Sequence, residues 1–231
     1  MKRSLGTILL IAVISFRINA ESADSLSVFS MTEKPIPRWM IPTMIGTVGV
    51  SFLLDEQLSG EPKSGFLKKV SHLTDYGGNK WYVVPSVLAA YSAGRWVLKD
   101  TKLQTTAWQS FQALTITAIA TEGLKNITGR ARPFTNHDAF TFHPFPGNDD
   151  TFKSMPSGHA SLAFAIFTPF AENYSRWLYL VPLSVAFGRV YQNKHWLSDV
   201  TTGSCIGFAS GWLFTHNKNI QLLPNGIIVK F

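Results

Sequence analysis

Six long uncharged segments recur along the chain, and they constrain its fold more than any other feature of the sequence. All six are rich in Ala, Leu, Ile and Phe, and none shows the strict alternation of apolar and polar residues that marks a half-buried strand. We therefore predict an all-α fold, a helical bundle of about five or six core helices. The segments are residues 39–54, 81–94, 103–121, 160–171, 177–188 and 200–215.

The length of 231 residues suits one domain of ordinary to large size. We divide the chain into a signal peptide over residues 1–20, a polar N-terminal segment over 21–38, a helical domain over 39–216 and a C-terminal tail over 217–231.

The two ends of the chain carry short local patterns. Lys2 and Arg3 precede an apolar run, and a small residue, Ala20, offers a cleavage point, as in a secretory signal. An uncleaved membrane anchor is the alternative. The tail carries one hairpin-like turn, Asn225-Gly226, but we expect the tail to be too short for a sheet.

The charge of the chain narrows the class of partner. A formal net charge of +7 and a pI near 9.6 favour acidic partners such as nucleic acid, anionic lipid head groups and phosphate esters. The basic residues do not form the dense runs of a nucleic-acid arm, so nucleic acid is not an expected partner, and no protein partner is predicted. The single cysteine, Cys205, excludes an intramolecular disulfide and a thiolate metal cluster.

The first chemistry-bearing motif is Lys125 with Arg132-Pro133. Gly129 and Pro133 mark where the preceding helix ends. A helix continuing through the motif would place Lys125 and Arg132 on one face, about two turns apart, where both could reach one anion. A basic helix end that complements the macrodipole or anchors in lipid head groups is the alternative.

The second motif is Pro156-Ser157-Gly158-His159, at the start of an apolar segment. Ser157 is a natural N-cap, and a helix N-terminus with a glycine lets an anion approach the backbone N–H groups. His159 follows directly and could protonate a leaving oxygen. An ordinary capped helix with an exposed histidine is the alternative.

The third motif contains Arg189, His195 and Asp199. His195 and Asp199 are four residues apart, which on a helix puts them on one face. The carboxylate could then accept from one ring nitrogen while the other attacks phosphorus, with Arg189 holding the phosphoryl oxygens. A surface ion pair of little energy is the alternative.

Together and in this order, the motifs resemble the signature of the type-2 phosphatidic acid phosphatase and vanadium haloperoxidase superfamily. The matching pattern is Lys125-x6-Arg132-Pro133, Pro156-Ser157-Gly158-His159 and Arg189-x5-His195-x3-Asp199, which covers about a third of the chain.

The resemblance implies a metal-independent phosphatase without a cofactor, for which vanadate is expected to be a phosphate-mimicking inhibitor. It implies that His195 forms a phosphohistidine, that Asp199 orients His195, and that His159 is the general acid. The implied phosphate-binding groups are Lys125, Arg132, Ser157, Gly158 and Arg189, with no metal ligands.

One position departs from the family pattern. The family usually has Ser before the arginine of the third motif, and this chain has Gly188. The missing hydroxyl could weaken phosphate binding, unless the glycine backbone compensates. Asp75, Glu122 and His143 receive no role from the sequence.

Membrane association is the favoured interpretation, although the mean hydropathy is only +0.09. Residues 103–121 approach the length of about 20 apolar residues that a span requires. Arg95, Lys99 and Lys102 between two segments suit a cytoplasmic loop, which would put the motifs on the outer face. This topology holds if residues 39–54 pack against the bundle or lie at the interface. A wholly soluble exported bundle would also place the motifs outside the cytoplasm.

We therefore predict an exported phosphatase of a bacterial-type cell envelope, membrane-associated, with its site facing the periplasm. Its substrate would be a phosphate monoester or pyrophosphate, of a lipid or else a small phosphate ester. Three alternatives follow in order: a soluble periplasmic non-specific acid phosphatase, a vanadium-dependent haloperoxidase, and a non-catalytic phospholipid-binding envelope protein.

Overall fold

The computed structural model describes residues 36–217, 220–223 and 226–229, apart from 61–64 and 136. The predicted signal peptide and nearly all of the polar segment lie outside the described residues.

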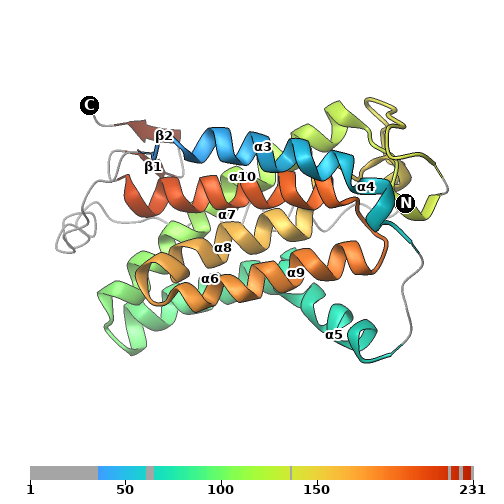
Figure 1. The fold of residues 1–231 in the computed structure, drawn as a ribbon. Helices are drawn as coiled ribbons and strands as arrows, with labels where there is room; N and C mark the ends of the chain where they lie inside the picture. The colour runs from blue at the N-terminus through green and yellow to red at the C-terminus, as the bar shows by residue number, and fades with distance from the viewer. Residues whose placement is uncertain (1–35, 61–64, 136, 218–219, 224–225, 230–231) are drawn as a thin grey trace, which may run out of the picture.

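The predicted all-α fold class is confirmed, and each of the six uncharged segments forms a helix (Figure 1). Two short helices without a long apolar run, α4 and α5, were not predicted. The helices are α3 (Met40–Leu53), α4 (Asp55–Leu58), α5 (Phe66–Thr74), α6 (Lys80–Ser92), α7 (Thr101–Thr128), α8 (Gly158–Asn173), α9 (Leu180–Tyr191) and α10 (Leu197–His216). Single turns of tighter or wider helix lie at η2 (Asp75–Gly78), η3 (Ala93–Val97), η4 (Pro133–Thr135), η5 (Asp150–Phe152) and η6 (Arg176–Tyr179).

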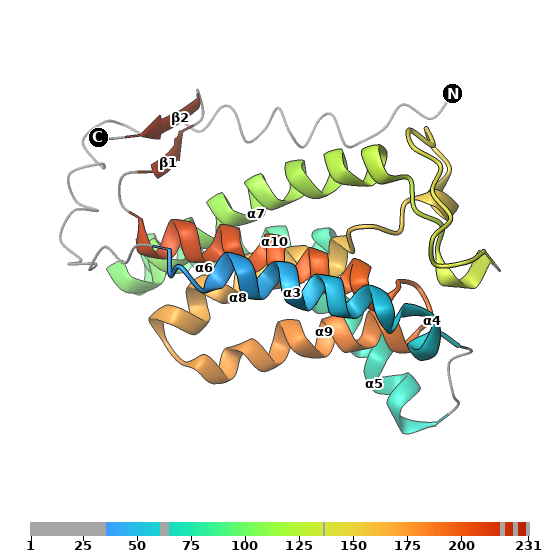
Figure 2. The same ribbon diagram turned by 45° about the horizontal axis from the view of Figure 1, so that its top comes forward.

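The C-terminal tail corrects one expectation. Strands β1 (Ile220–Leu223) and β2 (Gly226–Val229) pair antiparallel, with Ile220 opposite Val229. The tail is therefore long enough for a two-stranded ribbon, since each strand needs only four residues. The ribbon stands apart from the bundle axis at the end of α10 (Figure 2).

Helix α8 lies at the centre of the bundle, because α10, α7, α9 and α6 all contact it. Its partner α7 begins at the N-cap Asp100, whose carboxylate accepts from Lys102 N and Leu103 N. The main apolar cluster joins α6, α7 and α8 through Val83, Val87, Leu114 and Ile166.

A glycine stripe on α10 brings that helix unusually close to α8. Gly203, Gly207 and Gly211 recur every four residues, so they share one helix face. A Cβ at Gly207 would fall on the carbonyl oxygen of Ser161, which shows that the two backbones touch there. The consequence is that the N-terminal ends of α8 and α10 lie together, and the Ser157 amide donates to the Asp199 carbonyl at 2.9 Å.

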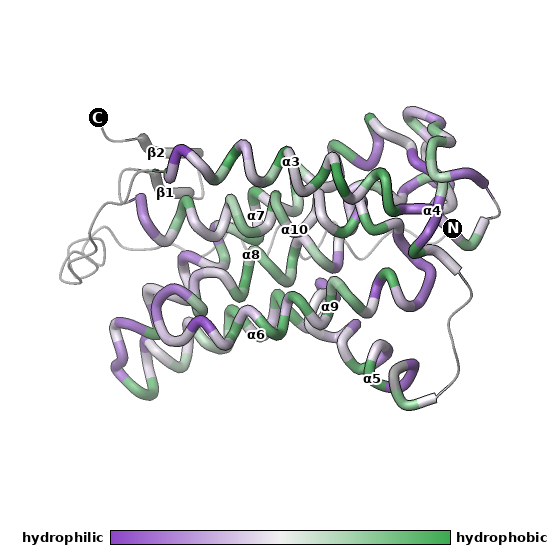
Figure 3. Tube along the Cα trace, viewed as in Figure 1, coloured by the Kyte–Doolittle hydropathy of each residue, from purple (hydrophilic) through white to green (hydrophobic). Residues whose placement is uncertain are grey.

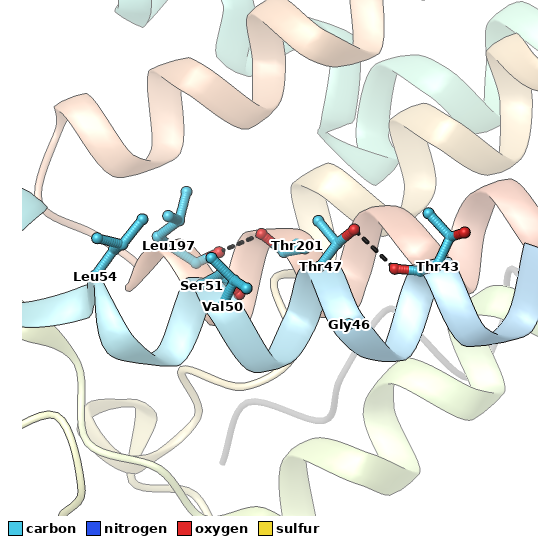
Figure 4. Close-up of a pocket in the computed structure, with 8 residues that line it drawn as sticks. All are labelled: Thr43, Gly46, Thr47, Val50, Ser51, Leu54, Leu197 and Thr201. Carbon is cyan, nitrogen blue, oxygen red and sulfur yellow. Dashed lines mark hydrogen bonds between the residues drawn. The ribbon is translucent and has the colours of Figure 1, made fainter.

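Helix α3 lies along α10 on the outside of the bundle (Figures 1 and 2). Packing against the bundle is one of the arrangements of residues 39–54 that the sequence left open. The contact is loose, because a mostly apolar groove of about 580 Å³ runs between the two helices (Figure 4). Thr43 and Thr47 in its wall donate their hydroxyls to the backbone carbonyls four residues earlier, those of Trp39 and Thr43.

Hydrophobic residues run along the middle lengths of α3, α6 and α9, and hydrophilic residues gather toward the helix ends (Figure 3). Among the described residues, no helix combines the length and the apolar character needed to cross a membrane.

Candidate active site

The three predicted motifs converge where α8 and α10 begin. His195 experiences the charges of Arg132, Lys125 and Arg189, and it also interacts electrostatically with His159. Lys125 Cε lies 3.8 Å from the position that a Cβ on Gly158 would take, which joins the first motif to the second.

His195 is held in one tautomer by the backbone. Its Nδ1 lies 2.8 Å from the carbonyl oxygen of Ser154, which can only accept, so Nδ1 carries the proton. The other nitrogen, Nε2, is left with its lone pair and lies 3.3 Å from Nη1 of Arg132. A buried imidazole whose unprotonated Nε2 faces a cation is suited to attack an electrophile held by that cation.

Asp199 supports His195 less directly than predicted. Its Oδ2 lies 3.8 Å from His195 Nδ1, outside hydrogen-bond range, because α10 begins only at Leu197 and His195 precedes the helix. The carboxylate instead accepts from Ser154 Oγ and from Trp196 N at 2.9 Å. Ser154 therefore touches both residues, with its carbonyl on the histidine and its hydroxyl on the aspartate.

Lys125 and Arg132 reach the site from different segments, which corrects the expectation of a shared helix face. Helix α7 ends at Thr128, and Gly129 follows in the left-handed conformation at φ 54°, so the chain turns before Arg132. Lys125 Nζ donates to the carbonyl of Lys153 at 2.6 Å. The Arg132 guanidinium donates twice to Asp150, to its backbone oxygen at 2.8 Å and its carboxylate at 2.9 Å.

Residues 134–155 connect the first motif to the second. In the structure this segment supplies Ser154, the Lys153 carbonyl and Asp150 to the site, so it forms part of the wall around His195.

The second motif lies as predicted at the start of α8, with one difference. Ser157 occupies the N-cap position, but its hydroxyl makes no capping bond. Ser157 Oγ is fully buried and has no hydrogen-bond partner among the described residues. An orphaned hydroxyl at a helix N-terminus is an unused donor at a place that attracts anions.

Arg189 lies in the last turn of α9 and is 5% exposed. Its Nη1 donates to Asp75 at 3.0 Å, while its Nε has no hydrogen-bond partner among the described residues. Gln192 Nε2 reaches the same Asp75 oxygen at 3.2 Å, and Lys194 Nζ lies 3.8 Å from the other. Asp75, which received no role from the sequence, thus anchors the arginine of the third motif.

Gly188 has a packing reason for lacking a side chain. A Cβ at this position would fall on Thr74 Oγ1 and lie 3.2 Å from the Ser71 carbonyl, because α5 crosses α9 there. The serine usual in the family would force the Thr74 hydroxyl out of its hydrogen bond to the Ser71 carbonyl, or would shift α5. Glycine in place of serine at position 188 is therefore explained by packing against α5, a helix that the sequence did not predict.

Burial and neighbouring cations shift the titrating groups of the site. Burial, and then Arg132, lower the pKa of Lys125 to about 8. Burial, and then Arg189, lower the pKa of His159 to about 4, so the ring is neutral at pH 7 when no anion is bound. The pKa of His195 is also well below its usual range, for the same reasons, while burial raises that of Asp199. A neutral, nucleophilic imidazole among cations is the result.

A second set of buried charges, absent from the predicted site, adjoins Asp199. Arg130 donates to Asp199 Oδ1 at 2.8 Å and to Asp55 Oδ2 at 2.7 Å. The sequence offered one signal, an extra arginine two residues before Arg132, and no pattern that pointed to Asp55.

Comparisons with known proteins agree with the motifs. The model of the PAP2 superfamily matches residues 106–221, which include all three motifs. The chain is 30% identical over 184 residues to a lipid A 1-phosphatase of Rhizobium etli, a match that covers 73% of this chain and 78% of that protein. It is 28% identical over 191 residues to a lipid A 1-phosphatase of Rhizobium johnstonii, with 75% and 78% covered.

A solved structure shares the fold. The crystal structure of Aquifex aeolicus LpxE superposes with a TM-score of 0.53 at 18% identity, over 73% of this chain and 93% of that one.

Proposed function

The chain belongs to the PAP2 superfamily, and on this premise we propose that it removes a phosphate group from a bacterial envelope lipid without a metal ion. The closest chemical description is hydrolysis of a phosphate ester of a lipid A-type glycolipid, the substrate class named for its Rhizobium relatives.

One observation carries the proposal: two buried donor atoms of residues that the motifs assign to phosphate have no hydrogen-bond partner among the described residues. Ser157 Oγ and Arg189 Nε lack partners among the described residues, in a site that also holds Lys125 and Arg132. Buried polar atoms are seldom left unpaired in folded proteins. A phosphoryl group bound between them would accept from both donors and offset the cations.

The reaction follows from the geometry of His195. Nε2 attacks phosphorus, the bond between phosphorus and the ester oxygen breaks, and His159 gives its proton to the leaving oxygen. The phosphohistidine is then hydrolysed by water, which transfers a proton back to His159 and returns His195 with inorganic phosphate. Lys125, Arg132, Arg189, Ser157 and the Gly158 amide stabilise the charge of the pentacoordinate state.

His159 needs a proton for this role, and its pKa of about 4 in the free site leaves it neutral at pH 7. A bound phosphate anion favours the imidazolium form, because it opposes the field of Arg189. Substrate binding is therefore the step that charges the general acid.

The exposed face of α9 supports a lipid substrate. Leu180, Leu183 and Phe187 follow helical spacing and are 57%, 52% and 53% exposed. The same helix carries Arg189 on its buried side, so an apolar outer surface and a phosphate ligand belong to one element. A formal charge of +7 adds attraction to anionic lipid. We infer an exported, membrane-associated enzyme with its site on the periplasmic face.

The test is phosphate release from detergent-dispersed lipid A 1-phosphate, phosphatidate, phosphatidylglycerol phosphate, an isoprenoid pyrophosphate and a soluble aryl phosphate, in EDTA. We expect release from the lipids, inhibition by vanadate, and loss of more than about 1,000-fold in the rate with His195→Ala, as for removal of a nucleophile. Acid quench of wild type should trap an acid-labile phosphoryl group that His195→Ala lacks.

Three results would contradict the proposal. A strict requirement for added divalent metal would defeat the mechanism, and undiminished activity of His195→Ala would remove the nucleophile. Turnover of the aryl phosphate with none of any lipid would favour a soluble acid phosphatase.

A further inference from the structure

A buried arginine joins two carboxylates that are 144 residues apart in the sequence. Arg130 pairs with Asp199 at 2.8 Å and with Asp55 at 2.7 Å, and all three side chains are 0% exposed. Its Nε also donates to the carbonyl of Ala139 at 2.7 Å. Every side of this guanidinium is therefore committed to the protein, unlike that of Arg189.

Aromatic rings enclose the same guanidinium. The ring centroids of Phe52, Trp196 and Phe142 lie 4.9, 5.6 and 5.7 Å from its central carbon. These residues come from α3, from the N-cap of α10 and from residues 134–155, which form part of the wall around His195. Water is kept away from the ion pairs, so they act at low effective dielectric and in fixed geometry.

Asp55 also fixes the start of α10. Its two oxygens accept from Ser198 N at 2.8 Å and from the Ser198 hydroxyl, while that hydroxyl receives Arg130 Nη1 at 2.6 Å. Ser198 directly precedes Asp199. Asp55 therefore holds both the Arg130 cation and the backbone at Ser198, and these two groups position the Asp199 carboxylate behind His195.

We propose that Asp55 and Arg130 are positioning residues for the nucleophile, so that the N-terminal α3–α4 segment completes the active site. This inference rests on the proposed function, which identifies His195 as the nucleophile. Neither residue contacts the phosphate-binding donors; both act through Asp199 and Ser154. Arg130 holds the Asp199 carboxylate in place, and its charge favours the ionised form of that carboxylate against the effect of burial. Asp199 in turn orders Ser154, whose carbonyl accepts from His195 Nδ1–H.

The chemistry explains why this matters for the rate. When Nε2 bonds to phosphorus, the imidazole becomes cationic, and an ionised Asp199 at 3.8 Å stabilises that charge. Arg130 and His195 lie within 4 Å of the Asp199 carboxylate, Lys125 interacts with it electrostatically, and Asp55 is linked to it through Arg130. Arg130 is the cation bonded directly to the carboxylate.

Two variants separate charge from position. Arg130→Met removes the cation, so Asp199 should take up a proton at higher pH. We expect kcat to fall, and we expect the acidic limb of its pH profile to shift to higher pH. Asp55→Asn keeps the ion pair between Arg130 and Asp199 but removes the ion pair that holds Arg130 from the side of α4. We expect kcat to fall about 10- to 100-fold, as for other groups that orient a reacting residue from behind, with no upward movement of the acidic limb.

The matched control is Glu172→Gln. Glu172 carries a largely inaccessible carboxylate, with 9% of its side chain exposed, which accepts from Tyr179 at the opposite end of α8, roughly 20 Å from the site. It should keep kcat within about twofold of wild type. KM for the aryl phosphate and the dissociation constant of tungstate should stay near wild type in Asp55→Asn, because phosphate ligands are untouched.

A readout without turnover separates this inference from the proposed function. The proton on His195 Nδ1 should give a protected resonance in nitrogen-15 NMR spectra, shifted or broadened in Asp55→Asn and unchanged in Glu172→Gln. An unchanged resonance with wild-type kcat in Asp55→Asn would overturn the inference even if His195→Ala behaves as proposed. Loss of tungstate binding in step with kcat would overturn it too, since that indicates collapse of the whole site.

Discussion

Lys125 combines a buried position with a charge that the proposed reaction needs. Its pKa of about 8 means that it is charged below this pH and loses its proton above it. A bound dianion prefers the charged form, so anion affinity should be full below pH 8 and should fall as pH rises further.

We predict that Lys125→Arg moves this alkaline loss of affinity to higher pH by at least about one pH unit, because arginine stays charged. Tungstate binding measured by calorimetry between pH 6 and 10 tests this without interference from the titration of phosphate. The exposed Lys99→Arg should behave as wild type. A midpoint that stays near pH 8 in Lys125→Arg would assign the titration to another group.

The residues in the motifs could be predicted from the sequence because each has a fixed spacing from its partners. Their connections could not. His195 was expected to touch Asp199, but the start of α10 at Leu197 leaves Ser154 between them. The role of Asp55 could not be predicted, since it depends on a contact with Ser198, which lies 143 residues later in the sequence. Only the folded chain shows which carboxylate reaches a given arginine.

At the scale of elements, the seam between α8 and α10 sets the distance between the proposed general acid and the nucleophile. Helix α8 carries Ser157 and His159 at its start, and His195 immediately precedes α10. Glycines at the seam allow backbone contact that a single methyl group would prevent. Six helices could be predicted from apolar composition. The distance between α8 and α10, however, depends on the glycine stripe of α10, whose packing role composition does not indicate.

We predict that Gly207→Ala destabilises the protein by about 1–3 kcal/mol and lowers kcat, because the added methyl pushes α10 away from the Ser161 carbonyl. Gly46→Ala is the matched control, since a Cβ at that position in α3 meets nothing within 4 Å. It should stabilise by roughly 0.5–1 kcal/mol through a better helix propensity and leave kcat unchanged. Denaturation midpoints and kcat of both variants would check this, and equal effects of the two would refute the close-packing argument.

At the scale of the whole molecule, the bundle is polar in much of its interior and apolar on parts of its surface. Thr106, Ser110 and Thr117 of α7 are fully buried, whereas Leu180, Leu183 and Phe187 of α9 are more than half exposed. Water does not favour this distribution, but a lipid surface would. The sequence indicated membrane association through its apolar segments, yet it could not show which helix faces carry the exposed side chains.

We predict that Leu180→Ser/Leu183→Ser/Phe187→Ser weakens binding to vesicles of mixed zwitterionic and anionic lipid about 100-fold. The three side chains would lose roughly 1 kcal/mol of apolar burial each. Turnover of a soluble aryl phosphate should stay within about twofold of wild type, because the phosphate-binding face of α9 is unchanged. Vesicle flotation, repeated in high salt, measures the effect. High salt screens the attraction of the +7 charge but not apolar burial, so wild type should remain bound and the variant should be released. Release of wild type by salt alone would show that charge, and not the face of α9, holds this protein to lipid.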